Sequence, residues 1–199
     1  MPHLPNVLHP LISIHLLPGG IMPERKSAGA IGYDVSARAI VSAYDMDPDN
    51  PYLRKTLFDF VQMPNDLEAA RHVVELETEN GRELAYRMDP QESILVGIGF
   101  VTAMPFPLFY WVAPRSGLAS KWGITVTNAP GTVDPDYRGE VGVLVYNRNK
   151  FPFDIKRGMR IAQIVFQWAI IPEIVPVSLY EELLGSERGA GGFGSTGLQ

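Results

Sequence analysis

Ser93–Thr102 reads SILVGIGFVT, an apolar run interrupted only by two glycines, and Gly142–Asn147 reads GVLVYN. Apolar runs of this length that are rich in Val and Ile favour buried β-strands over helices. Leu11–Leu17 and Phe109–Ala113 are similar, and 19 glycines and 17 prolines separate such runs along the whole chain. We therefore predict an all-β fold, either a sandwich, a jelly roll or a barrel.

Two stretches predict short helices. PNDLEAARHV, at residues 64–73, has polar residues at its start that suit an N-cap. SLYEELLG, at residues 178–185, has Ser178 and Glu181 at capping-box spacing and Gly185 where a C-terminal cap is expected. Between them, Asn80-Gly81 separates VVELETE from RELAYR, which predicts a hairpin with a two-residue turn.

Composition limits the classes of function. The 199 residues are 46% hydrophobic, which suits one well-packed domain. A net charge of −5 argues against nucleic-acid binding, which needs many basic side chains. The absence of cysteine excludes disulfides and cysteine-based catalysis and favours the cytoplasm. The apolar N-terminus lacks a basic start and is broken by His and Pro, so we expect neither a signal peptide nor a membrane span.

GTVDPDYRGE, at Gly131–Glu140, crowds acidic and basic side chains into a predicted turn. Charges in such a turn commonly pair with one another on the surface. Alternatively, a carboxylate such as Asp134 acts as a general base toward a water molecule held within hydrogen-bond reach. The segment alone leaves both interpretations open.

Three further segments carry groups that suit phosphate. APRSGLA, at Ala113–Ala119, is either an ordinary turn or a phosphate-binding loop. GMRIAQIVF, at Gly158–Phe166, places Arg160 and Gln163 in a core-like strand, where a buried glutamine often only binds backbone. RGAGGFGSTG, at Arg188–Gly197, is either a disordered tail or a segment that orders over a ligand bearing phosphate and a base.

Together with GAIGYDVSA at Gly29–Ala37, these segments resemble the five motifs of the trimeric dUTPase family, in the family's order. GAIGYDVSA resembles motif one, PRSGLA motif two, GTVDPDYRGE with Asn128 before it motif three, RGMRIAQ motif four and RGAGGFGSTG motif five. The resemblance covers nearly the whole chain apart from Asp45–Asp89. It implies a jelly-roll or distorted β-barrel with short helices, carrying a helix-plus-hairpin insertion.

The chain departs from the family pattern at two places. Asp34 and Arg115 are 115 − 34 = 81 positions apart, more than the family needs, which marks residues 45–89 as an insertion. Met159 stands where motif four commonly has an acidic residue, which changes a local surface charge but no phosphate contact.

The resemblance implies that the chain hydrolyses dUTP to dUMP and pyrophosphate, with Mg²⁺ and a water that attacks the α-phosphorus. Asp134 matches the carboxylate that orients and deprotonates this water, and Asp34 matches one that holds Mg²⁺ through its waters. Ser116 matches the residue near the leaving oxygen. The matched phosphate contacts are Arg115, Ser116, Gly117 and Gln163.

The resemblance assigns the base and sugar to the hairpin Asn128–Tyr137. Asn128 and nearby main chain match the groups that read uracil, Tyr137 excludes a 2′-hydroxyl, and Phe193 stacks on the base. The other hairpin residues matched to substrate are Gly131, Thr132, Val133 and Asp134. The tail residues matched to substrate are Arg188, Phe193, Gly194, Ser195 and Thr196.

We expect residues 1–185 to form a single β domain with the insertion at about 45–89, and residues 186–199 to form a flexible motif. In the family resembled, the subunits form a homotrimer in which this tail closes a neighbour's site. No nucleic-acid or membrane partner is expected.

Two alternative functions remain open. A dCTP deaminase shares the fold and a version of motif three, but it needs a catalytic glutamate where this chain has Leu144. A non-catalytic, nucleotide-binding regulatory protein is the other alternative, with the insertion as its partner-binding surface.

Overall fold

The structure is a computed structural model that describes residues 10–79, 81–183, 185–186 and 189–190. Arg188, Phe193, Gly194, Ser195 and Thr196 lie outside the described residues, so their predicted roles stay predictions. The chain divides into two compact units, Met1–Ala169 and Ile170–Gln199. The first unit, called the body below, therefore ends earlier than the predicted boundary at residue 185.

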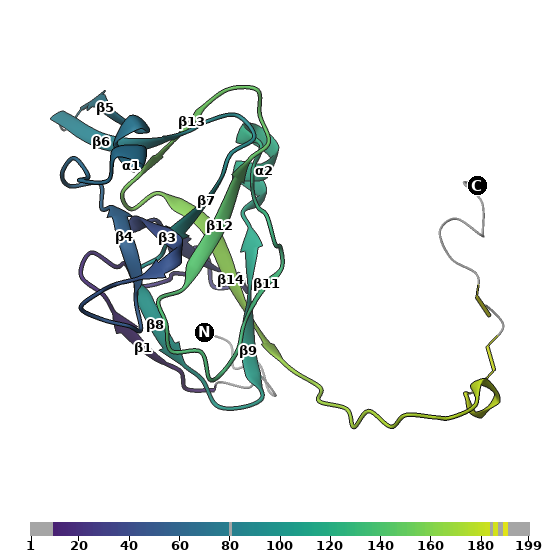
Figure 1. Cartoon of the computed structure of the whole chain (residues 1–199). Helices are drawn as coiled ribbons and strands as arrows, with labels where there is room; N and C mark the ends of the chain where they lie inside the picture. Colours follow the sequence, from purple (N-terminus) through teal and green to yellow (C-terminus); the bar gives the residue numbers. More distant parts are fainter. Residues whose placement is uncertain (1–9, 80, 184, 187–188, 191–199) are drawn as a thin grey trace. The chain divides into compact units, whose positions relative to one another are not determined.

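The described part of the body contains four antiparallel sheets, which confirms the all-β prediction (Figure 1). The sheet orders are β1-β8, β10-β12-β7-β3-β4, β11-β9-β14-β2 and β13-β6-β5. The strands are β1 (Ser13–Leu16), β2 (Tyr33–Ser36), β3 (Ala39–Met46), β4 (Arg54–Phe58), β5 (Val73–Thr78), β6 (Gly81–Met88), β7 (Ser93–Gly97), β8 (Phe100–Ala103), β9 (Leu108–Pro114), β10 (Ile124–Val126), β11 (Gly131–Val133), β12 (Gly142–Asn147), β13 (Phe153–Lys156) and β14 (Arg160–Trp168).

Alternating side chains build the core. In β12, every second residue is buried, as the period of two in a strand requires. The largest fully buried side chains come from several sheets and include Phe58, Met88, Ile98, Phe100, Leu108 and Tyr110. Burying such aromatic and aliphatic side chains supplies the main stabilising free energy of the fold.

The predicted strand over residues 93–102 is two strands in two different sheets. β7 ends at Gly97, and β8 begins at Phe100 and pairs with β1. Gly99 between them has a φ of 76°, and a Cβ added there would lie 2.4 Å from the Cα of Gly20. Only glycine fits both this dihedral and this close approach, so Gly99 permits the chain to change sheets.

Two α-helices lie within the described body. α1 (Leu67–Arg71) falls inside the predicted helix, and Asp66 is its N-cap, accepting a hydrogen bond from the Ala69 N–H. α2 (Ser116–Trp122) was not predicted, because only Leu118 of this short helix is buried and its sequence shows no apolar period. No helix among the described ranges is long and apolar enough to cross a membrane.

The second unit, described by itself, has one 3₁₀ turn, η1 (Tyr180–Glu182), instead of the predicted helix over residues 178–185. Leu179 is its N-cap and makes no side-chain capping bond, so the expected capping box with Ser178 is absent from this segment. Residues 170–183 are all exposed. A helix of this length without a buried face is not stable in water, which explains the error.

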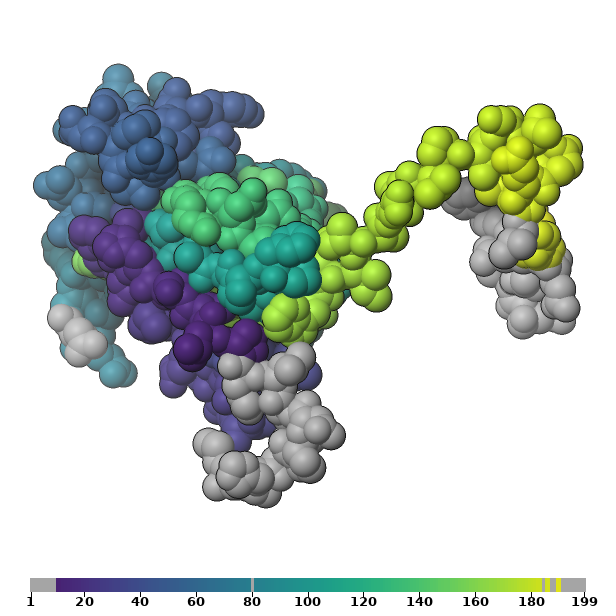
Figure 2. Space-filling model, turned by 90° about the horizontal axis from the view of Figure 1, so that it is seen from below, coloured from purple at the N-terminus to yellow at the C-terminus, as the bar shows by residue number. Residues whose placement is uncertain are grey.

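The predicted hairpin is present. β5 and β6 pair from Val73 opposite Tyr86 to Thr78 opposite Gly81, so the connection falls one position before the predicted Asn80-Gly81 turn. Figure 1 shows α1, β5 and β6 together at one end of the body. In Figure 2, the blue segment that precedes α1 forms a lobe on the body.

Both ends of the predicted insertion at residues 45–89 belong to the core sheets, which corrects its boundaries. β4 pairs with β3, and its last residue, Phe58, is 1% exposed. β6 pairs with β13, placing the fully buried Met88 opposite Phe153. Removal of residues 45–89 would therefore expose the core. The sequence pattern missed this because strand pairs between distant segments leave no local signal.

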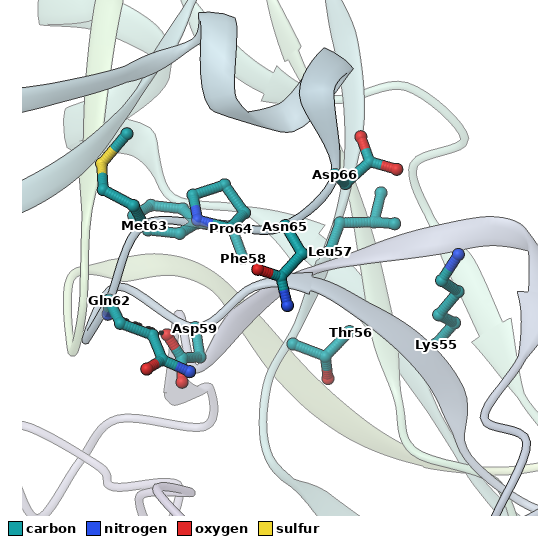
Figure 3. Close-up of a pocket in the computed structure, with 10 residues that line it drawn as sticks. All are labelled: Lys55, Thr56, Leu57, Phe58, Asp59, Gln62, Met63, Pro64, Asn65 and Asp66. Carbon is teal, nitrogen blue, oxygen red and sulfur yellow. Dashed lines mark hydrogen bonds between the residues drawn. The ribbon is translucent and has the colours of Figure 1, made fainter.

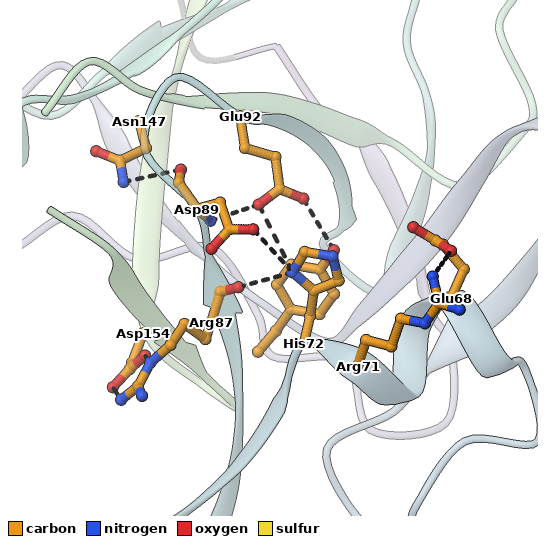
Figure 4. Close-up of polar contacts among 9 residues, drawn as sticks. Glu68, Arg71, His72, Arg87, Asp89, Glu92, Asn147 and Asp154 are labelled. Carbon is orange, nitrogen blue, oxygen red and sulfur yellow. Dashed lines mark hydrogen bonds and ion pairs between the residues drawn. The ribbon is translucent and has the colours of Figure 1, made fainter. Parts of the chain in front are cut away.

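Polar side chains also tie the hairpin to the rest of the body (Figure 4). Arg87 of β6 donates through Nε and Nη2 to the two carboxylate oxygens of Asp154, at 2.8 Å each. Asn147 of β12 donates from Nδ2 to the carbonyl oxygen of Asp89 at 3.1 Å. The bidentate Arg87–Asp154 pair both stabilises the fold and fixes the position of β6 relative to β13.

Candidate active site

Asp34, Arg115, Arg160 and Gln163 form one polar cluster, called the arginine cluster below. The Asp34 carboxylate accepts from Arg115 Nε at 2.9 Å and from Arg160 Nη1 at 2.6 Å. Asp34 is 15% exposed and Arg115 24%, so water screens this pairing only in part. Gln163 lies opposite Asp34 on one side and Ala113 on the other. Neighbouring strands thus bring Arg160 to Asp34, 126 positions away in the chain.

Arg160 was noted in the sequence but was not assigned to the site. It begins β14, and its carbonyl oxygen also accepts from Arg115 Nη1 at 3.1 Å. The two guanidinium groups therefore lie on the same carboxylate. The sequence contained no signal for this pairing, because it depends on the register of β2 against β14.

The Gln163 side chain lies close to Gly32, the second glycine of GAIGYDVSA. A Cβ on Gly32 would stand 2.2 Å from Gln163 Oε1, so no larger residue fits there. Gln163 donates from Nε2 to the carbonyl oxygen of Pro114 at 2.9 Å. Its amide keeps a second N–H that a phosphate oxygen can accept from.

Ser116 and Gly117 form the first turn of α2, directly after Arg115. Both are exposed, and nothing lies within 4 Å of a Cβ built on Gly117. The Ser116 hydroxyl has no hydrogen-bond partner in the described part of the chain. This turn therefore has room and donors for a ligand beside the arginine cluster.

The hairpin residues line a separate pocket of about 220 Å³, called the hairpin pocket below. Its lining residues are Arg54, Leu95, Thr132, Val133, Asp134, Tyr137, Val141 and Gly142. Tyr137 donates from its hydroxyl to the Glu140 carbonyl oxygen at 3.0 Å, which holds the ring in the turn. Asn128 is exposed at the other end of β11, where Gly131 leaves space for its amide.

The charges of this turn do not pair with one another. Asp134 is exposed and makes no ion pair among the described residues. Arg138 instead donates to backbone carbonyl oxygens, including that of Pro135 at 2.7 Å. Glu140 turns inward to Arg38. The Asp134 carboxylate is therefore free to accept a hydrogen bond from a ligand or a water.

Glu140 is 1% exposed and accepts from Arg38 Nε and Nη2 at 2.7 Å each, and from the Gly99 N–H at 3.0 Å. We predict that Glu140→Ala lowers the free energy of unfolding by about 3–5 kcal/mol, because it leaves the largely buried guanidinium of Arg38 without a carboxylate partner. Urea denaturation of both proteins measures the difference. As a control, Glu75→Ala removes the exposed pair with Arg82 and should cost less than about 1 kcal/mol. Equal losses in the two variants would contradict the buried pairing.

The structure does not bring the arginine cluster and Asp134 together in one chain. In the sheet register, Asp34 lies opposite Gln163, and Gln163 lies opposite Ala113 of β9. Val133 instead lies opposite Tyr110, three positions before Ala113 in β9. Three strand spacings also separate β2 from β11. With about 3.3 Å per residue and about 4.8 Å between strands, Asp34 and Asp134 are roughly 15–20 Å apart. They cannot both contact one phosphorus atom from the same chain.

A family comparison decides the classification. The sequence profile of the family described as dUTPase matches residues 83–197, more than half of the chain. The chain belongs to the dUTPase family. The match includes motifs two to five and begins within β6, which supports assigning β6 to the family's core rather than to an insertion.

Curated relatives of the dUTPase family agree. The deoxyuridine 5′-triphosphate nucleotidohydrolase of Nautilia profundicola is 51% identical over 108 residues, which are 54% of this chain and 74% of that protein. The protein of the same name from Rhizobium rhizogenes is 50% identical over 111 residues, covering 55% of this chain and 68% of that protein.

Solved dUTPase structures share the fold. The dUTPase of Staphylococcus bacteriophage 80alpha has a TM-score of 0.62 at 20% identity and covers 94% of this chain and 99% of its own. The dUTPase from phage phi11 of S. aureus, described with a species-specific insert, has a TM-score of 0.57 at 18% identity and covers 87% of this chain and 99% of its own. At these identities the likeness concerns the fold alone.

A pocket of about 440 Å³ lies between the end of β4 and the loop before α1 (Figure 3). It contains none of the predicted dUTPase site residues. Asp59 accepts from the Val61 N–H and Asp66 from the Ala69 N–H, at 2.9 Å each. Because its carboxylates already bind local backbone, we assign no ligand to this larger pocket.

His72, Asp89 and Glu92 place potential metal-ligating atoms within 4.8 Å of one another (Figure 4). His72 Nδ1 lies 3.1 Å from the Arg87 carbonyl oxygen, and its ring stacks on Tyr86. The Tyr86 hydroxyl donates to Glu92 at 3.0 Å, and burial together with the Glu92 charge raises the Tyr86 pKa. These groups satisfy one another, so we treat them as structural.

Proposed function

We propose that the chain hydrolyses dUTP to dUMP and pyrophosphate. The observation that carries this proposal is the free Asp134 carboxylate at the hairpin pocket of a chain that belongs to the dUTPase family. A carboxylate that forms no ion pair keeps its oxygens available to a bound water. Asp134 is thus available as the general base that deprotonates the attacking water.

The nucleoside half of dUTP would occupy the hairpin pocket. Leu95, Val133 and Val141 offer apolar contacts to a base, and Tyr137 offers its ring to the deoxyribose. A 2′-hydroxyl would meet this ring, which disfavours UTP. Asn128, at the end of β11, is proposed to read the edge of uracil together with nearby main chain.

The triphosphate would lie against the α2 turn and the arginine cluster. Arg115 and Gln163 donate N–H groups, and Ser116 donates its hydroxyl to the oxygen of the leaving group. Stabilising negative charge as it develops on that oxygen is where such donors contribute most to the rate. Gly117 leaves space for the phosphates.

We further propose a homotrimer in which these two halves of the site come from different subunits. The separation of roughly 15–20 Å between Asp34 and Asp134 in one chain supports this arrangement. A closed head-to-tail interface would place the Asp134 of one subunit beside the arginine cluster of the next. The tail residues, from Arg188 to Thr196, would then close over the substrate.

Asp34 suits a magnesium ion held through water. Each Asp34 carboxylate oxygen already accepts one hydrogen bond from an arginine. One lone pair therefore remains on each oxygen. Mg²⁺ keeps several of its waters, so these lone pairs would accept hydrogen bonds from the hydrated ion. When bound, the ion would neutralise charge on the phosphate oxygens.

The cytoplasmic location expected from the lack of cysteine also stays a prediction.

Nucleotide selectivity tests this proposal. We predict that kcat/KM for dUTP exceeds that for dCTP, dTTP and UTP by about a hundredfold or more, because a mismatched hydrogen bond or a steric clash disfavours each of the others. Pyrophosphate release with Mg²⁺ measures all four rates. A kcat/KM for dTTP or dCTP close to that for dUTP would contradict a uracil-specific site.

A further inference from the structure

Arg54 begins β4, inside the segment predicted to be an insertion at residues 45–89. It nevertheless lines the hairpin pocket together with Asp134 and Tyr137. None of the five motifs contains this residue. The pocket is thus completed by a side chain that precedes the matched part of the chain, residues 83–197.

One nitrogen of Arg54 is fixed by the backbone of β3. Nη1 donates to the Ala43 carbonyl oxygen at 2.7 Å and lies 3.4 Å from that of Ser42. These carbonyls lie where β3 departs from regular pairing with β4, between Val41 and Met46. The Ser42 hydroxyl accepts from the Asp45 N–H at 2.9 Å and stabilises this bend. The guanidinium position is therefore defined before a ligand arrives.

The other nitrogens of Arg54, Nε and Nη2, have no acceptor in the described part of the chain. Arg54 and Asp134 line the same small pocket, yet they form no ion pair with each other. A half-buried guanidinium beside Leu95, Val133 and Val141 is partly removed from water, so its free N–H groups favour an acceptor from a ligand.

We infer that Arg54 donates a hydrogen bond to a neutral acceptor oxygen of the nucleoside half of the substrate, a base carbonyl or a sugar oxygen. This inference rests on the proposed function and extends it, because it makes β4 part of the substrate site. The triphosphate is the less suitable acceptor, because in the proposed trimer the arginine cluster of the next subunit already supplies its donors, Arg115 and Gln163. Arg54 thus contributes to binding and not to the proton transfer.

Direct binding measurements test the assignment. In Arg54→Gln, the Kd for dUMP is expected to rise about tenfold, the usual effect of losing one hydrogen bond from a charged donor. The KM for dUTP should rise similarly, with kcat within about twofold of wild type. Arg54→Lys keeps the positive charge but loses the planar guanidinium, so its Kd for dUMP should lie between those of wild type and Arg54→Gln. The affinity for pyrophosphate should not change.

Lys55→Gln is the matched control, because residue 55 follows in the same strand and lines the pocket of Figure 3 instead. It should bind dUMP like wild type. An unchanged dUMP Kd in a folded Arg54→Gln variant would overturn the inference, as would an equal loss of pyrophosphate affinity. A wild-type protein that does not hydrolyse dUTP would instead contradict the proposed function, so the two failures are distinguishable.

Discussion

Replacing Asp134 with asparagine is expected to lower kcat for dUTP by about 10²–10⁴-fold, the usual contribution of a general base. Asparagine keeps the size of the side chain and one accepting oxygen but cannot take a proton from water. Asp134 makes no ion pair in the described part of the chain, so its loss should leave the fold intact. Steady-state pyrophosphate release measures the change in kcat.

Binding separates this role from a structural one. A non-hydrolysable dUTP analogue should bind Asp134→Asn nearly as tightly as wild type, because the lost function is basicity and not a phosphate contact. Asp136→Asn is the control, since Asp136 is an exposed carboxylate two residues away. A wild-type kcat in Asp134→Asn would assign Asp134 to the surface charges of the turn.

Truncation after Gly185 is expected to give the second large effect, a loss of kcat of about a hundredfold or more. It removes Arg188, Ser195 and Thr196, the proposed phosphate donors of the tail, together with Phe193, the proposed stacking partner of uracil. Removing a donor that stabilises developing charge commonly costs 10²–10³ in rate. The removed residues belong to the unit Ile170–Gln199, so the truncation takes away none of the core of the unit Met1–Ala169.

The truncated protein should remain a trimer in light scattering while its kcat falls. Unchanged kinetics would show that the tail has no part in closure. A monomeric intact protein would contradict the shared site. Mixing provides a sharper comparison: trimers reassembled from Asp134→Asn chains and truncated chains should recover some activity, because certain sites would combine an intact Asp134 with another subunit's intact tail.

The all-β class and the chemistry of the motifs could be predicted from the sequence because both depend on local signals. Short Val-rich and Ile-rich runs became strands, and β12 matches the predicted segment at Gly142–Asn147. The hairpin after α1 was also predicted, within one position at its turn. Each of these features depends on neighbouring residues, which is why a single sequence suffices for them.

Features that depend on pairing between distant segments could not be predicted. β6 reads like part of an insertion until its pairing with β13 shows Met88 in the core. Arg160 becomes part of the site only through Asp34, 126 positions away. Arg54 reaches the hairpin pocket because β3 bends beside β4. The separation between Asp34 and Asp134 likewise follows from strand order, which motif spacing does not contain.

The most direct test of the central claim is to identify the products that the purified full-length chain forms from dUTP and dCTP with Mg²⁺. We predict one pyrophosphate and one dUMP for each dUTP consumed, and no ammonia from dCTP, because the hydrocarbon side chain of Leu144 cannot transfer a proton. Ammonia release from dCTP, or nucleotide binding without any product, would contradict the assignment of this chain as a dUTP-hydrolysing enzyme.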